Sequence, residues 1–182
     1  MNIFTMKKVC ISLIRNIFLK IMFKSNYQCN WICSCDSPTF IRLERDAKLI
    51  IGRHLSSRRN LTINVRKNAI CSIGDNVNFN DNCSITCRQN ISIGNEVIFG
   101  PGCMIFDHDH DYHKFGCERR KSTITGKIEI GNGVWFGANC IILKDTQIGD
   151  NCVFSAGSII KGTYEDNSLV IQKKYEQITS IR

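Results

Sequence analysis

The sequence predicts an all-β protein, a parallel β-helix built from a six-residue repeat, with an N-terminal helix and one loop excursion. Three observations predict this fold. Large apolar residues recur every six residues from Ile130 to Ile160, small or branched residues stand four positions after the first five of them, and glycine or asparagine lies near the expected corners. A period of six fits neither a 3.6-residue helix nor two-residue alternation. It fits short straight segments separated by turns, three of which close one triangular coil.

The ladder has three kinds of position. Its large residues are Ile130, Phe136, Ile142, Ile148, Phe154 and Ile160. Its small residues are Val134, Cys140, Thr146, Cys152 and Ser158. The corner candidates, which accept the positive φ of tight turns, are Gly131, Asn132, Gly137, Asn139, Gly149 and Asn151. Upstream, the ladder runs through Ile73, Phe79, Ile85 and Ile91, is reset by a two-residue insertion to Ile93, Phe99 and Ile105, and breaks between His110 and Ile128.

The chain of 182 residues suits one domain with its own core. We expect an N-terminal helix and cap region over residues 1–48, a β-helix over 49–170 that contains a loop over 111–127, and a C-terminal tail over 171–182. Residues 6–24 are predicted to be helical, and Thr39–Leu43 is predicted to be a strand. Loops that leave a repeat scaffold commonly carry its function.

Charge is distributed unevenly along the chain. Residues 1–70 hold 13 basic and 3 acidic groups, whereas residues 71–182 hold 11 and 13. The basic N-terminal third indicates either an anionic partner or a solvated basic surface. No nucleic-acid partner is expected.

Eleven cysteines are present, but several occupy the small position of the repeat, where cysteine serves as a small apolar residue. These are Cys83, Cys103, Cys140 and Cys152. The total is odd and no paired CxxC motif occurs, so we expect reduced thiols in the cytoplasm rather than a disulfide framework or a zinc site.

The predicted N-terminal helix has two interpretations. Lysines and arginine interrupt its apolar stripe, so no uncharged run is long enough to span a bilayer, and no secretory signal is expected. A basic amphipathic helix could lie on an anionic membrane, at the inner face. The alternative is a helix that packs against the end of the β-helix and buries Val9, Leu13, Ile17 and Ile21.

Three of the four histidines cluster just before the loop, in the segment IFDHDHDYH. Histidine titrates near neutral pH and a neighbouring carboxylate can fix its tautomer, so this segment could supply a general base. His108, His110 and His113 could instead bind a metal, or the segment could be a polar corner without chemistry.

The segments IGNEVIFGPGCMIFDHDH, IEIGNGVWFGANCIILKDTQIGDNCVFSAGSII and DNSL resemble the hexapeptide-repeat acetyltransferases of the maltose and galactoside O-acetyltransferase type, especially those of capsule and O-antigen synthesis. The resemblance covers roughly residues 50–170. It implies a left-handed coil, although the usual crossover rule favours a right-handed one. It also implies a homotrimer with acetyl-CoA between adjacent subunits, and no metal.

Site residues follow from the resemblance by position. It places the catalytic histidine at His110, with His108 as the close competitor, and the acceptor-binding residues at Asn80 and Asp107. The residues that it implies along the coenzyme A arm are Trp135, Ala138, Ala156, Gly157 and Lys161.

The chain also departs from the family pattern. Arg88 stands where the galactoside enzymes have an acceptor-binding carboxylate, so a galactoside is not the expected acceptor. KGTYEDNS replaces the usual TKDIPPNS, and Gly162 stands where relatives have a basic residue that contacts coenzyme A, which leaves Lys161 as the nearest substitute.

The function expected from these observations is acetyl-CoA-dependent O-acetylation of a sugar hydroxyl in a bacterial surface polysaccharide or its precursor. N-acetylation of an amino sugar remains open on the same scaffold. A β-helix zinc carbonic anhydrase is a weaker alternative, because three histidines crowded into one segment differ from ligands on separate coils. A non-enzymatic solenoid would not need the loop and the histidine cluster.

Overall fold

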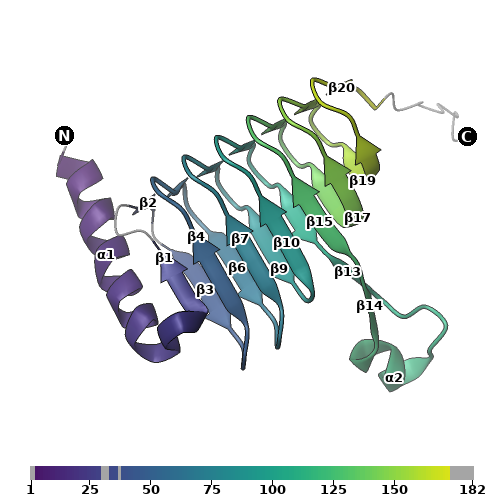
Figure 1. Cartoon of the computed structure of the whole chain (residues 1–182), viewed down its shortest axis with the longest axis horizontal. Coiled ribbons are helices and arrows are strands. Elements are labelled where there is room, and N and C mark those ends of the chain that lie inside the picture. The colour runs from purple at the N-terminus through teal and green to yellow at the C-terminus, as the bar shows by residue number, and fades with distance from the viewer. Residues whose placement is uncertain (1–2, 30–32, 37, 173–182) are drawn as a thin grey trace, which may run out of the picture.

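The computed structural model describes residues 3–29, 33–36 and 38–172, and the side chains of residues 3–5 are not described. It is an elongated parallel β-solenoid with a helix, α1 (Ile3–Phe23), across its N-terminal end (Figure 1). A short 3-10 turn (Lys24–Asn26) leads from α1 into the first strand. Among the described residues, no helix is both long enough and apolar enough to cross a membrane.

Three faces of short parallel strands enclose the core. The first face contains β1 (Tyr27–Cys29), β4 (Lys48–Ile51), β7 (Ile70–Ile73), β10 (Asn90–Ile93) and β15 (Lys127–Ile130). The second contains β2 (Ser34–Cys35), β5 (Ser56–Ser57), β8 (Asn78–Phe79), β11 (Ile98–Phe99), β16 (Trp135–Phe136), β18 (Val153–Phe154) and β20 (Leu169–Val170). The third contains β3 (Thr39–Leu43), β6 (Leu61–Val65), β9 (Ser84–Cys87) and β12 (Met104–Phe106).

Two longer strands, β17 (Ile141–Ile148) and β19 (Ile159–Tyr164), turn the corner from the third face to the first. They join these two faces into one eleven-stranded sheet, beside the seven-stranded sheet of the second face. The parallel β-helix that the six-residue repeat predicts is therefore confirmed. The C-terminal tail expected over 171–182 lies outside the described residues from position 173 onward.

The large and small residues of the repeat occupy the positions expected of them. The side chains of Phe79, Phe99, Phe136 and Phe154 are at most 1% exposed and stack in one column, with ring centroids 4.5 to 5.2 Å apart. The small-position cysteines from Cys83 to Cys152 are all buried. Asn139 and Asn151 adopt a φ of 57° at corners, a conformation that asparagine tolerates better than most residues. The other corner candidates, Gly131, Asn132, Gly137 and Gly149, do not adopt a positive φ. The three glycines are instead positions where a Cβ would clash with the next coil.

The solenoid extends one coil further toward the N-terminus than the boundary expected at residue 49. Strand β1 pairs with β4, β2 with β5 and β3 with β6, so the described residues between 27 and 43 place one strand on each face of a first coil. The sequence predicted only the strand Thr39–Leu43 in this region, because its coil is longer than three hexapeptides.

Candidate active site

The loop excursion is an ordered arm that projects from the side of the solenoid (Figure 1). Strand β13 (His108–His110) pairs antiparallel with β14 (Thr123–Thr125), and the short helix α2 (Gly116–Lys121) lies at the tip. The backbone N–H of Asp111 donates to the Ser122 carbonyl oxygen over 3.1 Å, which closes the hairpin. The arm leaves at the corner between the third and first faces, so it presents its histidines beside that corner.

His110 is exposed, and one of its ring nitrogens makes a hydrogen bond within the arm. Nδ1 lies 3.0 Å from the backbone carbonyl oxygen of Arg119 in α2. A carbonyl oxygen only accepts hydrogen bonds, so in the neutral ring Nδ1 carries the proton and Nε2 keeps a free lone pair. The arm therefore holds His110 in the tautomer that a general base requires, with Nε2 facing away from this bond.

His108 is held differently, at the base of the arm. Its side chain is 13% exposed, and Nδ1 lies 3.3 Å from Oδ1 of Asp107. The ring meets that of Phe106 edge to face, with centroids 6.3 Å apart. A carboxylate at Nδ1 also selects the tautomer with a free Nε2, so both histidines are oriented for proton transfer.

Asp107 lies wholly buried, although the resemblance places it among the acceptor-binding residues. Its carboxylate accepts hydrogen bonds from the backbone N–H groups of Arg88, Gln89 and Asn90 at 2.7 to 3.0 Å. Burial raises the pKa of Asp107, but the bonds from His108 and from the Gln89 and Arg88 N–H groups outweigh it and hold the pKa below its ordinary value. With no exposed surface, this carboxylate caps a corner of the preceding coil and orients His108.

The three clustered histidines do not converge on a common point. Tyr112 packs on the ring of His113, with centroids 4.2 Å apart, in the exposed turn before α2. Within the described part of the chain, no three His, Cys, Asp or Glu side chains are placed to hold one metal ion.

The residues implied for the coenzyme A arm gather near the corner between the second and third faces. Trp135 lies on β16 with 54% of its side chain exposed. Ala138 and Gly157 occupy successive levels of that corner, where the Gly157 N–H donates to the Ala138 carbonyl oxygen over 2.7 Å. A Cβ on Gly137 would lie 2.5 Å from the backbone nitrogen of Ala156, so the two coils stack closely. Gly137 has no side chain that projects from the surface beside Trp135. Lys161 is exposed on β19, one face away.

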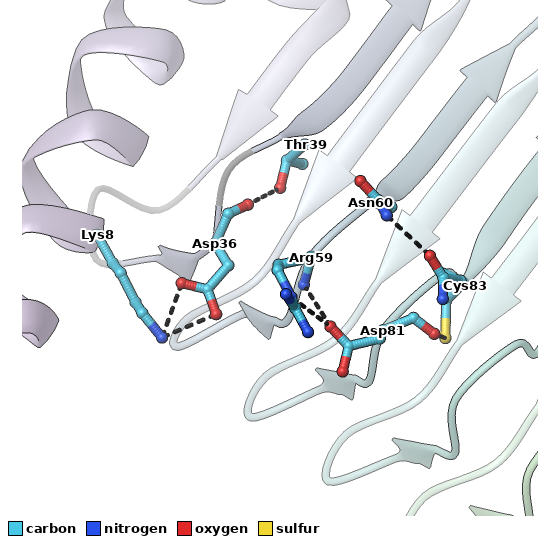
Figure 2. Close-up of polar contacts among 8 residues, drawn as sticks. Lys8, Asp36, Thr39, Arg59, Asn60, Asp81 and Cys83 are labelled. Atoms are coloured by element: carbon cyan, nitrogen blue, oxygen red, sulfur yellow. Dashed lines mark hydrogen bonds and ion pairs between the residues drawn. The ribbon is translucent and has the colours of Figure 1, made fainter.

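Asn80 lies lower on the same corner as Ala138. Its side-chain amide donates to the Phe99 carbonyl oxygen over 3.1 Å, and the side chain stays partly exposed. Below it, a groove of about 380 Å³ contains the ion pairs Lys8–Asp36 and Arg59–Asp81, at 2.8 and 3.3 Å (Figure 2). The lower corner is therefore polar, whereas the upper corner consists of small residues.

One subunit does not bring these parts together. His110 stands at the corner between the third and first faces, whereas Trp135 lies on the second face and Ala138 at the corner beyond it. The outer side of the third face separates them within a single chain. A site that uses both groups therefore requires a second copy of the chain.

Sequence reasoning missed two contacts that shape the site. The partner of His110 is a backbone carbonyl, which no residue type could have revealed. The role of Asp107 had a signal, because the two-residue insertion before Ile93 exposes extra N–H groups that need an acceptor.

Comparisons with known proteins give the following similarities. Residues 127–162 match the model of the bacterial transferase hexapeptide family (six repeats). The chain is 26% identical over 185 residues, 94% of this chain and 91% of the relative, to a putative lipopolysaccharide biosynthesis O-acetyl transferase, WbbJ, of Escherichia coli (strain K12). Among solved structures, a maltose O-acetyltransferase from Clostridium difficile 630 superposes with a TM-score of 0.48 at 17% identity, over 93% of this chain and 89% of that one. A galactoside acetyltransferase in complex with coenzyme A gives 0.47 at 21% identity, over 88% and 76%.

The family match falls on the coils that carry the clearest six-residue ladder, and the curated relative extends the similarity along nearly the whole chain. The resemblance to hexapeptide-repeat acetyltransferases is thereby confirmed.

Proposed function

We propose that this protein transfers the acetyl group of acetyl-CoA to a hydroxyl of a sugar in a bacterial surface polysaccharide or its precursor. The observation that carries the proposal is His110, an exposed imidazole whose Nδ1 is held by the Arg119 carbonyl on an arm of a hexapeptide solenoid. The hexapeptide transferase match and the O-acetyl transferase name of the curated relative support the same class of reaction.

The arrangement of His110 fits a direct transfer. Nε2 removes the proton from the sugar hydroxyl, and the oxygen attacks the thioester carbonyl carbon of acetyl-CoA. The tetrahedral intermediate collapses, the carbon–sulfur bond breaks, and the proton passes from the imidazolium to the departing thiolate. No covalent acetyl-enzyme is needed, because both substrates are held together in one site.

The substrate positions follow from the surfaces around the corner. Trp135, Ala138, Ala156 and Gly157 would hold the pantetheine arm, with Lys161 near the nucleotide end. Asn80 and the polar groove below it would bind the saccharide through hydroxyl hydrogen bonds. Because His110 and Trp135 lie on different faces of one chain, the site would form between neighbouring subunits of a homotrimer.

We place the reaction in the cytoplasm, at the inner face of the membrane. The buried cysteines from Cys83 to Cys152 fit a reducing compartment, because the repeat uses them as core thiols.

The test is an acetyl-transfer assay with labelled acetyl-CoA and surface-glycan precursors, comparing His110→Asn with His54→Asn. His54 is exposed on a distant corner with a φ of 57°, which asparagine accepts, so it is the matched control. His110→Asn is expected to lower turnover by about 100- to 10,000-fold, the usual contribution of general acid–base catalysis. His108→Asn is the companion variant, and greater damage from it than from His110→Asn would move the base to His108.

The chemistry of the product separates O- from N-acetylation. An ester formed on a hydroxyl is released by mild alkali, whereas an amide persists. Failure of every saccharide acceptor, with acetyl-CoA intact, would contradict the proposed activity.

A further inference from the structure

The N-terminal helix is attached to the solenoid through a side that carries buried polar groups beside buried Leu19. The Tyr27 hydroxyl donates to Asn16 Oδ1 over 2.8 Å, and the Cys35 backbone N–H donates to the Ser12 hydroxyl over 3.2 Å. Asn16 and Ser12 are at most 1% exposed. Lys8 adds an ion pair to Asp36 on the first coil (Figure 2). Because buried polar groups are costly unless paired, these bonds fix which side of α1 faces inward.

The opposite side of α1 is apolar and uncovered in the single chain. Ile14, Phe18 and Ile21 are 60 to 70% exposed. With their neighbours they form the outer stripe of α1, which consists of Met6, Ile11, Ile14, Ile17, Phe18, Ile21 and Met22, all with large exposed side chains. Spacings of three and four residues place them on one side of the helix. The cap interpretation places Val9, Leu13, Ile17 and Ile21 against the solenoid. Val9 and Leu13 are half-buried, whereas Ile17 and Ile21 are exposed.

Charges around the outer stripe have one sign. α1 contains no acidic residue, and its helical period places Arg15 and Lys20 at the two borders of the outer stripe. Lys7 and Lys24 are exposed near its two ends. An apolar face bordered by cations matches the interface of an anionic bilayer, where apolar side chains enter the acyl boundary and basic groups stay among the headgroups.

From this geometry we propose that the outer stripe of α1 docks the protein onto an anionic membrane surface. α1 crosses the N-terminal end of the solenoid (Figure 1). Because Ser12 and Asn16 bond to the first coil, the exposed outer stripe lies on the side of α1 away from the coils. The helix therefore lies along the membrane plane, and the solenoid rises from it. This docking is independent of acetyl transfer, since it uses none of the proposed catalytic groups.

A second copy of α1 is a poorer occupant of the same stripe. Paired helices would bring the bordering cations together, and neither helix offers a carboxylate to compensate them. If the protein forms the proposed homotrimer, threefold symmetry places the three stripes at the same height along the axis. All three would then contact one bilayer, and the effective affinity would exceed that of one helix.

The experiment is vesicle flotation of the full-length protein at low salt, with phosphatidylcholine vesicles that contain or lack phosphatidylglycerol. The test variant is Ile14→Gln/Phe18→Gln/Ile21→Gln. Because these side chains are exposed, circular dichroism and the melting temperature should match the wild type. The matched control, Ile159→Gln/Leu169→Gln, changes side chains that are 56 and 67% exposed on the last coil.

The wild type and the control are expected to float only with phosphatidylglycerol vesicles. The triple variant is expected to lose partitioning by about 100-fold or more, because three large apolar side chains no longer enter the acyl boundary. Lys7→Gln/Lys24→Gln should bind the anionic vesicles more weakly, and its binding should depend less on salt. The apolar side chains of the outer stripe would still enter the bilayer.

Two outcomes would overturn the inference. One is a wild-type protein that stays in solution with both kinds of vesicle. The other is a triple variant that floats like the wild type but has a changed oligomeric state by light scattering, which would assign the outer stripe to a contact between copies. Because the readout is flotation without acetyl-CoA, a failure of docking is distinguishable from a failure of the proposed acetyl transfer.

Discussion

The two halves of the solenoid build the same three faces with coils of different length. In the C-terminal half, Ile128 pairs with Thr146 and Trp135 with Val153, 18 residues apart, which is three hexapeptides. In the N-terminal half, Tyr27 pairs with Leu49 and Leu49 with Cys71, 22 residues apart. The extra residues lengthen the third face, where β3 and β6 have five residues each, and the corner that follows it.

The cores of the two halves differ as well. The column of stacked phenylalanines runs from Phe154 down to Phe79 and stops there, because Ser57 and then Cys35 occupy the next levels. The corners change from small residues to arginines, and α1 covers the end. The comparison shows that the triangular cross-section does not depend on an 18-residue coil. It depends on parallel pairing between successive coils with alternate residues facing inward.

The largest expected effect lies in the phenylalanine column. Phe99 is fully buried between Phe79 and Phe136, so Phe99→Ala leaves a cavity and removes two stacked contacts. The free energy of unfolding should fall by about 3–5 kcal/mol, measured by urea denaturation at fixed protein concentration. The control is Ile98→Ala, on the same strand but 46% exposed. Equal losses for the two variants would contradict the idea that the column stabilises the C-terminal half.

The contrast between the halves explains which parts of the fold the sequence could predict. The six-residue ladder predicts coils from about residue 49 onward and is most regular in the C-terminal coils, where 18 residues place one large residue at each level. The 20-residue step from Ile73 to Ile93 resets its phase. The ladder misses the first coil, because a 22-residue coil shifts the phase at every turn. The outward direction of the apolar stripe of α1 could not be predicted either, since bonds from Ser12 and Asn16 to the first coil decide it.

The candidate site also has parts that the sequence predicts and parts that only the structure shows. The histidine cluster beside the loop was predicted from the sequence. The roles expected of Trp135, Ala138 and Gly157 came with the resemblance, as did the expectation of a left-handed coil. The tautomers of His108 and His110 depend on tertiary contacts with Asp107 and with a backbone carbonyl. Such contacts leave no periodic pattern in the chain.

An intermediate loss of stability is expected for Asp107→Asn, at the corner that Asp107 caps between the two halves of the solenoid. In Asp107→Asn the side-chain NH₂ would face backbone N–H donors, and the charge that they stabilise would be lost. Hydrogen bonds to charged groups contribute about 1.5–3 kcal/mol, so the free energy of unfolding should fall by a similar amount at neutral pH.

The control for this variant is the pH dependence of the unfolding free energy. The pKa of Asp107 is lower in the folded protein than its unfolded value of about 3.9, so the carboxylate stabilises the fold above that pH. The stabilisation is lost as the pH falls through the folded pKa. The difference in unfolding free energy between wild type and Asp107→Asn should therefore shrink in acid. A constant difference down to the acid transition would show that the lost charge is not the cause.

The smallest effect concerns Ser57, where the phenylalanine column ends. The Ser57 side chain is 5% exposed, and within the described residues its hydroxyl oxygen has no hydrogen-bond partner. Removing an unpaired buried hydroxyl relieves its desolvation cost, so Ser57→Ala should raise the free energy of unfolding by about 1 kcal/mol. The matched comparison is Ser158→Ala, a buried small-position serine whose hydroxyl donates to the Ser155 carbonyl oxygen over 2.6 Å. That variant should lose stability, because it removes a bond that is made. A shift of the urea midpoint in the same direction for both variants would contradict this prediction. It would mean that the Ser57 hydroxyl is hydrogen-bonded as well as the Ser158 hydroxyl, so the two cores would not differ at this level.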